Sequence, residues 1–485
     1  MTAQVTRDDT RKVLGNLKFG SGVAEHEQHL KDYFLRTSLY KRVVNDELDL
    51  VRGVKGSGKS AMFRYLQQDQ HPAKADVVVV PAFDFGEDEA FQRIIKAWSG
   101  ATEDTLRRRW RVYLLALVGN ELVERFGGHE AVAELSAYLE TLHLRQPVRG
   151  RLSRLIQKFR EAPIAWDEED DDDRIESVTQ DLAEVAAATR DALAALNRRA
   201  WVVFDRLDEA FYTDVAAERQ ALRSLMQVTR DLNAADPEGR RIRVKLFMRE
   251  DIFNRISRGG SQVNLSHIRD ADLRWYPDTL SELLCRRVIQ HEDHCRLFRL
   301  KPSHAKTTAG RSTIISTLLP EATPFPLPCR DNHVTATTWN WVMTYLRDGK
   351  GYVSPRNLLT FFDIACREQE DMWEDDGDRG TRDALLGGKA LNRAWRTLSR
   401  ERMEDTVVAE DGELEPYIDR LMNGAHRYTS PEALAARLEC AGDDLRFERV
   451  FDRLLSAGVL TKLGGGQYSI AYLYRPVLNV DPTLD

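Results

Sequence analysis

Stretches of apolar residues predict a chain built from short buried strands and longer helices. Four consecutive valines lie within residues 76–85, and a second apolar run, Ala200 to Phe204, directly precedes Asp205. Continuous runs of this length are typical of parallel strands covered on both faces. Shorter strand-like runs lie at 48–51 and at 243–249. Apolar residues at helical spacing fill much of the sequence between the runs, so the pattern predicts an α/β domain.

A long helical excursion separates two of these strands. Residues 88–160 have mostly helical spacing, which resumes from Ile175 to Leu196. We therefore expect a helical insertion at about 88–197. The acidic run at 167–173 interrupts the insertion. Its adjacent carboxylates repel one another and lack the alternation of a calcium loop, which favours a solvated loop over a cation site.

The last part of the chain predicts a small domain of its own. Ser430 followed by Pro431 has the chemistry of a helix start, and residues 447–460 form an amphipathic pattern. Residues 461–470 place a glycine turn between two strand-like segments. Two helices followed by a hairpin are typical of a winged helix. The second helix has nearly balanced charge, which favours a contact with protein or with the rest of the chain over DNA, and both interpretations stay open.

Composition excludes several classes of protein. The 485 residues suffice for about three domains. A net charge of −7 argues against a protein coated for nucleic acid. No apolar stretch approaches the roughly 18 residues of a membrane span, so no membrane partner is expected. The N-terminus lacks the apolar core of a signal peptide, and the five dispersed cysteines show no CxxC spacing, so we expect reduced thiols and a cytoplasmic location.

A glycine-rich loop follows the strand-like run at 48–51. It has the spacing Gly-x-x-x-x-Gly-Lys-Ser and precedes a segment of helical periodicity. This is the context of a phosphate-binding loop, in which backbone N–H groups and the helix N-terminus meet the phosphates. Lys59 would reach the β- and γ-phosphates, and the Ser60 hydroxyl would ligate Mg²⁺. The residues predicted to bind the nucleotide are Gly53, Val54, Lys55, Gly56, Ser57, Gly58, Lys59, Ser60 and Ala61.

Acidic residues follow the strand at 200–204. Asp205 stands at its carboxyl end, where it can hold Mg²⁺. Asp208 and Glu209 come a few residues later, close enough to orient or deprotonate an attacking water. Glu209 is the first choice for this base and Asp208 the second. The alternative is a strand followed by a solvated acidic turn.

Two arginines are candidates for contact with the γ-phosphate. Arg249 ends the strand-like run at 243–249 and could stabilise transition-state charge; alternatively it pairs with Glu250 or Asp251 at the surface. Arg356 lies in the first turn of a predicted helix, where a cation is unfavourable unless an anion faces it. A phosphate contact and a structural ion pair are both open for Arg356.

A cluster with metal-ligating side chains lies at His291-Glu-Asp-His294-Cys295. A closed zinc site needs four ligands, and the sequence shows no partner pair. The pattern therefore favours the end of a surface helix.

These motifs together resemble those of the AAA+/STAND group of P-loop ATPases. Residues 204–209, Phe-Asp-Arg-Leu-Asp-Glu, are similar to the NACHT-type magnesium motif and depart from it at Arg206, where that form carries a small residue. Met248-Arg249 is similar to the first sensor and Ser354-Pro-Arg356 to the second. The N-terminal half resembles a group of bacterial stand-alone ATPases through residues 19–25, Tyr33-Phe34 and 54–60.

The resemblance implies an α/β P-loop NTPase core, a parallel sheet with helices on both faces, together with a helical lid and a winged-helix-like domain. The implied division is an N-terminal segment at 1–47 that packs on the nucleotide site, a core at 48–260 that contains the insertion, a lid at 261–400 and a winged-helix-like domain at 401–485. Phe19 and Gly20 would then lie near the adenine.

The resemblance also implies a slow or trigger-dependent, Mg²⁺-dependent ATPase that works as a nucleotide-controlled switch between its ATP and ADP forms. Its partner would be a second copy of the chain or an effector protein. Some members of the bacterial group are encoded beside anti-phage genes, which implies a role in anti-phage defence. Two alternatives stay open: an ATPase that binds duplex DNA through the winged helix, and a scaffold that binds ATP without turnover, which the departure at Arg206 keeps in view.

Overall fold

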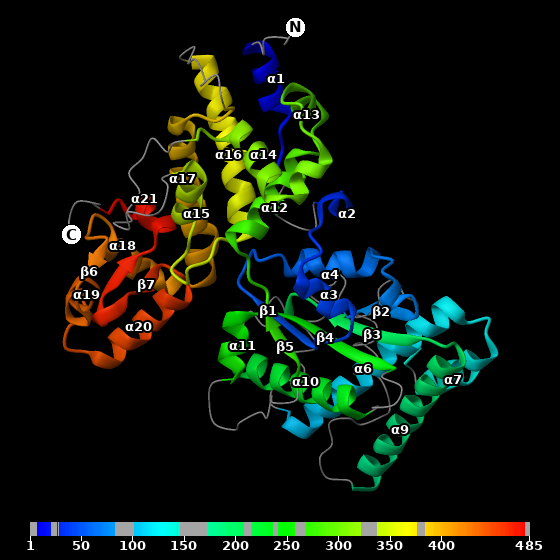
Figure 1. Cartoon of the computed structure of the whole chain (residues 1–485). Helices are drawn as coiled ribbons and strands as arrows, with labels where there is room; N and C mark the ends of the chain where they lie inside the picture. Colours follow the sequence, from blue (N-terminus) through cyan, green and yellow to red (C-terminus); the bar gives the residue numbers. More distant parts are fainter. Residues whose placement is uncertain are drawn as a thin grey trace. The chain divides into compact units, whose positions relative to one another are not determined.

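The computed structural model divides into two compact units, each with its own hydrophobic core (Figure 1). The sheet unit comprises Arg36–Lys55 and Lys59–Leu273, and the helical unit comprises Met1–Leu35, Gly56–Gly58 and Arg274–Asp485. The four-part division inferred from the sequence remains a prediction. The structure describes residues 7–20, 27, 29–82, 101–142, 144–145, 172–207, 215–235, 241–257, 268–321, 337–375 and 384–480.

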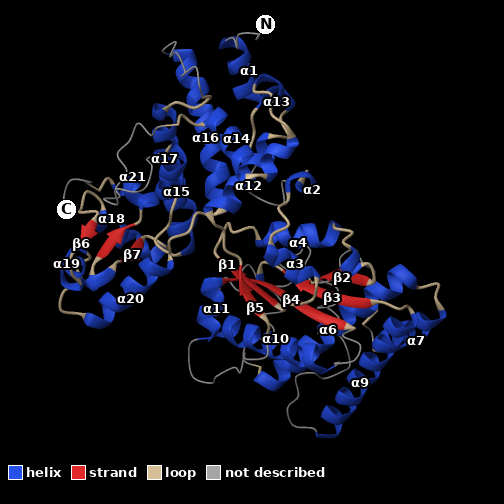
Figure 2. Ribbon diagram, viewed as in Figure 1, coloured by secondary structure: helices blue, strands red, loops and turns tan. Residues whose placement is uncertain are grey.

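A five-stranded parallel sheet forms the centre of the sheet unit, with the strand order β2-β3-β4-β1-β5 (Figure 2). Its inner strands β3 and β4 are mostly apolar and almost completely buried, as expected for parallel strands with helices on both faces. The predicted parallel α/β sheet is therefore confirmed. The strands are β1 (Leu50–Gly53), β2 (Val77–Pro81), β3 (Arg199–Phe204), β4 (Ile242–Arg249) and β5 (Asp270–Asp272).

Helices cover both faces of this sheet (Figure 1). Successive side chains of a strand point to opposite faces. Phe204 of β3 packs against Trp110 of α6 on one face, whereas Phe247 of β4 packs against Phe63 of α4 on the other. Helices α6, α7 and α9 all lie between β2 and β3 in the chain. The helices of the unit are α3 (Ser38–Val44), α4 (Lys59–Gln68), α6 (Glu103–Phe126), α7 (Glu130–Thr141), α9 (Asp172–Ala195), α10 (Val215–Ala235) and α11 (Glu250–Ser257), with the 3-10 turn η2 (Pro72–Lys74).

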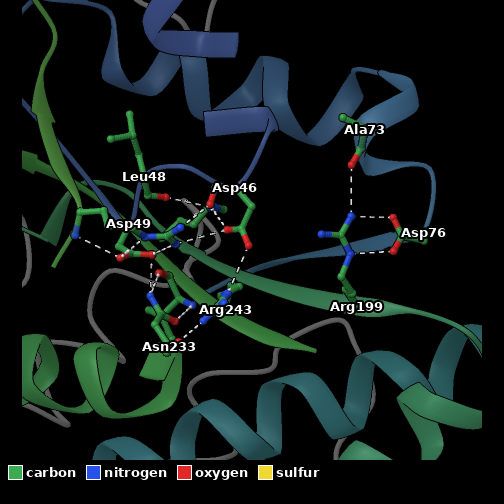
Figure 3. A network of polar contacts seen from close by, with 11 residues as sticks. Asp46, Leu48, Asp49, Ala73, Asp76, Arg199, Asn233 and Arg243 are labelled. Carbon is green, nitrogen blue, oxygen red and sulfur yellow. Dashed lines mark hydrogen bonds and ion pairs between the residues drawn. The ribbon is translucent and has the colours of Figure 1, made fainter. Parts of the chain in front are cut away.

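A buried ion-pair network joins the amino ends of β1, β4 and β5 (Figure 3). Asp46 pairs with Lys245 at 2.8 Å and with Arg243 at 3.2 Å, and Asp49 pairs with Arg269 at 2.5 Å. Burial by itself raises the pKa of Asp46, but Lys245, Arg243 and Arg269 lower it below its ordinary value. This network lies at the end of the sheet opposite the loop that follows β1, and its buried charges compensate one another.

The helical unit has one continuous core that runs from its first helix to the C-terminal strands. Trp341, Phe361 and Phe362 are among its fully buried side chains. Its helices are α1 (Arg7–Asn16), α2 (Leu30–Tyr33), α12 (Pro277–Val288), α13 (Glu292–Leu297), α14 (Thr308–Leu318), α15 (Thr338–Tyr345), α16 (Pro355–Asp375), α17 (Gly388–Arg402), α18 (Glu415–Leu421), α19 (Pro431–Arg437), α20 (Asp444–Ser456) and α21 (Arg475–Leu478). Short turns are η4 (Pro302–Lys306), the π-helical η5 (Met403–Val408), η6 (Gly412–Leu414), η7 (Gly464–Gly466) and η8 (Tyr472–Tyr474).

The C-terminal part of this unit contains the predicted sequence of two helices and a hairpin. The Ser430 side chain accepts a hydrogen bond from Ala433 N at 3.3 Å, and Pro431 follows at the first helical position. The second helix, α20, begins earlier than the predicted 447–460 and ends at Ser456. The hairpin strands β7 (Leu460–Lys462) and β8 (Tyr468–Ile470) pair with a strand that the sequence did not predict, β6 (Arg427–Tyr428), in the antiparallel order β6-β8-β7. Its identity as a winged helix, and the identity of the preceding helices as a lid, remain predictions.

None of the helices in the described part of the chain combines the length and the apolarity that a bilayer crossing requires.

Candidate nucleotide-binding site

The glycine-rich loop joins the carboxyl end of β1 to the amino end of α4. Gly56 has φ 78° and Gly58 has φ 94°, both in the left-handed region that glycine adopts without strain. Gly53 is the last residue of β1, and Lys55 is exposed on the loop. Because α4 begins at Lys59, the N–H groups of its first turn, including those of Ser60 and Ala61, lack helical partners and are suited to bind an anion. The predicted strand, loop and helix are therefore all present.

The Lys59 side chain lies over its own loop. Its ammonium donates hydrogen bonds to the carbonyl oxygens of Gly53 at 2.9 Å and of Val54 at 3.0 Å. A flexible lysine held by neutral carbonyls can exchange them for phosphate oxygens, with which its charge interacts more strongly.

Asp205 follows β3 and lies beside the loop. It is 2% exposed, and burial raises the pKa of its carboxyl group to about 6. A hydrogen bond with the Ser60 hydroxyl, the charges of Lys59 and Arg206 and the backbone N–H of Arg206 act in the opposite direction. Among the residues that the structure describes, Asp205 Oδ2 has no hydrogen-bond partner.

The pair of Ser60 and Asp205 fits a magnesium ion. Mg²⁺ prefers oxygen ligands, and it is commonly held by one or two protein groups together with water and substrate phosphates. A buried carboxylate oxygen without a partner is costly unless a cation or water satisfies it. The two predicted metal-binding residues are thus in contact, and one of them has an oxygen available to a cation.

Arg206, which stands where the related motif carries a small residue, has an unfavourable backbone conformation. Its φ is 54°, in the left-handed region. Residues with a Cβ adopt this region at a cost, whereas glycine adopts it without strain. The position after Asp205 therefore has a conformation that arginine adopts at a cost.

Asp208 and Glu209, the two predicted bases, lie outside the described residues. The preceding Leu207 is fully buried and is the last described residue of this segment. The catalytic roles of Asp208 and Glu209 remain predictions.

Arg249 ends β4 and is in register with Gly53 of β1. Its guanidinium makes a two-pronged ion pair with the Asp251 carboxylate, at 3.0 Å and 2.8 Å. This is the pairing that the sequence left open as the alternative. The strand end places Arg249 next to the loop, and its role toward a γ-phosphate remains a prediction.

Phe19 and Gly20, the residues expected near the adenine, lie in the helical unit. The Phe19 ring is fully buried and packs against Phe362 at a centroid distance of 5.3 Å, while its N–H donates to Asp363 Oδ1 at 2.8 Å. Gly20 has φ 92°, and a side chain there would overlap Arg287 and Glu27. Phe19 thus anchors the segment in the core, and its contact with a base remains a prediction.

The loop residues Gly56–Gly58 contact the rest of the helical unit. Trp275 Nε1 donates a hydrogen bond to the Ser57 carbonyl at 2.7 Å, and the Arg356 N–H donates to the Gly56 carbonyl at 3.4 Å. The Ser354 hydroxyl accepts from Asn357 N at 3.1 Å, as predicted for a helix cap. The Arg356 backbone therefore contacts the loop, and its side chain also lies beside Gly56, since an added Cβ there would come within 3.1 Å of Arg356 Cβ. Trp275 was not predicted, because a single tryptophan between β5 and α12 forms part of no periodic pattern.

The cluster around His291 has three separate sets of partners. His291 bonds the Lys18 carbonyl at 2.8 Å, and the buried His294 bonds the Thr317 hydroxyl at 2.9 Å. The Cys295 thiol donates to the Ile289 carbonyl at 3.4 Å. In the described ranges no three His, Cys, Asp or Glu side chains are arranged to hold a metal ion.

Comparisons with known proteins find distant similarities. No protein-family model matches the chain. A curated relative, the putative transposon gamma-delta 80.3 kDa protein of Escherichia coli K12, is 22% identical over 249 residues, which are 50% of this chain. The chain spans about a third of that relative's length, 34%.

Two solved archaeal structures also resemble the chain weakly. The Walker-type ATPase PABY2304 of Pyrococcus abyssi has a TM-score of 0.41 at 10% identity and covers 93% of this chain and 97% of its own. The Cdc6p structure of Pyrobaculum aerophilum has a TM-score of 0.31 at 11% identity, with coverages of 98% and 97%.

Proposed function

We propose that the chain binds and hydrolyses ATP with Mg²⁺ and works as a nucleotide-controlled switch. The observation that carries the proposal is the buried Asp205 carboxylate, which is hydrogen-bonded to Ser60 at the end of a phosphate-binding loop and has one oxygen without a partner among the described residues. A carboxylate placed so is costly in the free protein and is suited to a cation that arrives with the nucleotide.

The residues divide the work of phosphoryl transfer between them. Backbone N–H groups from Gly56 to Ser60 would bind the β-phosphate. Lys59 would leave the carbonyls of Gly53 and Val54 for the β- and γ-phosphates. Ser60 and Asp205 would hold Mg²⁺, which supplies positive charge to the phosphate oxygens when bound.

The groups that act on the γ-phosphate complete the proposal. Glu209, or in second place Asp208, would orient the attacking water. Arg249 would break its ion pair with Asp251 and interact instead with the charge that develops on the γ-phosphate. Arg356 would provide a second positive charge there.

A switch is favoured over a DNA-binding ATPase by the pairing of arginines on α20. Arg453 forms ion pairs with Asp411 and with Glu413, the latter at 2.7 Å, and Arg446 donates to the Tyr417 hydroxyl at 3.1 Å. Side chains engaged in this way must break internal contacts before they can bind phosphates of duplex DNA. The partner would then be a second copy of the chain or an effector protein. A role in anti-phage defence and a cytoplasmic location rest on the resemblance of the sequence motifs.

The test is steady-state ATP hydrolysis with Mg²⁺, with and without duplex DNA. Lys59→Ala and Glu209→Gln should each reduce turnover at least about 100-fold, because they remove transition-state charge stabilisation and the water-orienting base. Lys41→Ala, which removes an exposed lysine of the same unit, is the matched control and should leave turnover unchanged.

The switch, the DNA-dependent ATPase and the scaffold predict different results in this assay. Slow ATP turnover that duplex DNA does not change, and that Glu209→Gln abolishes, supports the switch. Turnover that rises with DNA supports the DNA-dependent alternative. ATP binding without any turnover supports the scaffold, provided that Lys59→Ala abolishes the binding. Absence of ATP binding in the unmodified chain would refute all three.

A further inference from the structure

We propose that Trp275 is a positioning residue for the phosphate-binding loop, holding the Gly58 N–H in the direction of the nucleotide. The inference rests on the proposed function of the loop and deepens it. It follows from the hydrogen bond of 2.7 Å that the Trp275 indole donates to the Ser57 carbonyl.

The planarity of the peptide bond gives this contact its consequence. In a trans peptide the carbonyl of one residue and the N–H of the next point in opposite directions. The Ser57 carbonyl and the Gly58 N–H belong to one such plane, so a donor that fixes the carbonyl also fixes the N–H. Gly58 adopts φ 94° here, and because glycine has no Cβ it has several accessible conformations of similar energy, so its own backbone sterics hold this plane weakly. A loop built from glycines therefore benefits from an external contact that selects one of them.

The neighbouring peptide is held in the same manner. The Arg356 N–H donates to the Gly56 carbonyl, although at a longer 3.4 Å, and so favours one direction for the Ser57 N–H. Two consecutive N–H groups of the loop are thus oriented by contacts on the opposite side of the backbone. Two aligned N–H groups are the arrangement that binds a phosphate oxygen.

The surroundings of Trp275 suit a fixed donor. Its ring packs against the core of the helical unit and also lies 4.0 Å from where a Cβ at Gly58 would be. The next residue, Tyr276, is 62% exposed and forms the N-cap of α12. Trp275 thus lies directly before the first turn of α12, and the helix limits the movement of its indole ring.

The test compares Trp275→Phe with the unmodified chain in nucleotide binding. The phenyl ring keeps most of the packing and removes the donor. A hydrogen bond contributes about 0.5–1.5 kcal/mol net, so ATP and ADP should each bind about 2- to 12-fold more weakly. AMP lacks the β-phosphate that the loop would bind, so its affinity should not change. The thermal unfolding midpoint without nucleotide should fall by no more than a few degrees, because the hydrogen bond is also present in the free protein.

Trp395→Phe is the matched control. Trp395 is a partly buried tryptophan of the same unit, and its indole nitrogen has no hydrogen-bond partner among the described residues. The control should bind ATP, ADP and AMP like the unmodified chain. A second variant replaces Trp275 with benzothienylalanine, which keeps the two fused rings and loses only the N–H, and it should reproduce the loss seen for Trp275→Phe.

Each contrary result has a separate meaning. Unchanged ATP and ADP affinity in both Trp275 variants overturns the inference and leaves the proposed function intact. A loss that extends equally to AMP in both variants assigns Trp275 a structural role only and also overturns it. An unmodified chain that binds no ATP refutes the proposed function, and the inference with it.

Discussion

At the residue scale, Asp205 combines a functional position with a cost in stability. Its pKa is raised to about 6, mainly by burial, so the folded chain holds this proton more tightly than the unfolded chain does. Stability therefore falls as the pH rises from about 4 to about 6 and stays lower above that range. A charge that is costly without its cation is common at sites that bind one.

Asp205→Asn should accordingly make the nucleotide-free protein more stable while it abolishes Mg²⁺-dependent turnover. The pKa difference corresponds to about 3 kcal/mol at pH 8 and to about half of that at pH 5. Urea unfolding at both pH values, without nucleotide, measures the effect. If the variant and the unmodified chain were equally stable at pH 8, ionised Asp205 would not be destabilising in the free protein.

At this scale, part of the candidate site follows from sequence motifs. The glycines at 56 and 58 and the acid at 205 stand in motifs whose spacing has a physical meaning. Trp275 could not be predicted, because its partner is a backbone carbonyl more than 200 positions away in the chain. The pairing of Arg249 with Asp251 could be listed only as one of two outcomes, because a local pair and a phosphate contact suit the same sequence.

At the element scale, the network around Asp46 joins three strands through charges that have little access to water. Asp46, Arg243 and Lys245 are at most 5% exposed. Removal of one partner from such a group leaves the others buried and uncompensated. The amino edge of the sheet therefore depends on Asp46 more than on any exposed ion pair.

Asp46→Asn should destabilise the sheet unit by about 3–5 kcal/mol at pH 7. Asp46 has φ 60°, which asparagine tolerates well, so the substitution removes the charge with little backbone strain. The pKa of Asp46 is lowered in the fold, so its contribution is present above about pH 4 and is lost as the pH falls through the folded-state pKa. Chemical denaturation at pH 7 and at pH 3 tests this.

Asp104→Asn serves as the control for that experiment, because Asp104 is 79% exposed where it pairs with Arg107. Its substitution should change stability by less than about 0.5 kcal/mol. A second substitution, Lys245→Met, should recover part of the loss caused by Asp46→Asn, since it removes a buried charge left without its partner. A loss for Asp46→Asn no larger than for Asp104→Asn would contradict the role of the network.

Elements could be predicted where their own residues carry the pattern. The segments that form β2, β3 and β4 are rich in apolar residues and were predicted as strands. The strand β5 was missed, because its Asp-Ala-Asp sequence has no apolar run and it becomes a strand by pairing with β1. β1 extends over Arg52 and Gly53, beyond the predicted 48–51, because Arg52 pairs with Asp272 of β5 and Gly53 pairs with Arg249 of β4.

At the scale of the whole molecule, the two units combine segments that are far apart in the sequence. Residues 1–35 belong with 274–485, for example through the packing of Phe19 on Phe362. Local sequence patterns do not show which distant segments pack together. A division into domains made from the sequence therefore lists the N-terminal segment separately.

Two separate cores lead us to expect two unfolding transitions in calorimetry, since a cooperative unit of folding is defined by its own buried contacts. Leu222 of α10 and Leu358 of α16 are both fully buried, one in each core. Leu222→Ala should lower only the transition of the sheet unit and Leu358→Ala only that of the helical unit, each by about 2–5 kcal/mol. Scanning calorimetry of the full chain and of both variants, without nucleotide, separates the cases. A single transition that both substitutions shift would mean that the two cores unfold together. Any change in the stability of the sheet unit would then also change the unfolding of the helical unit.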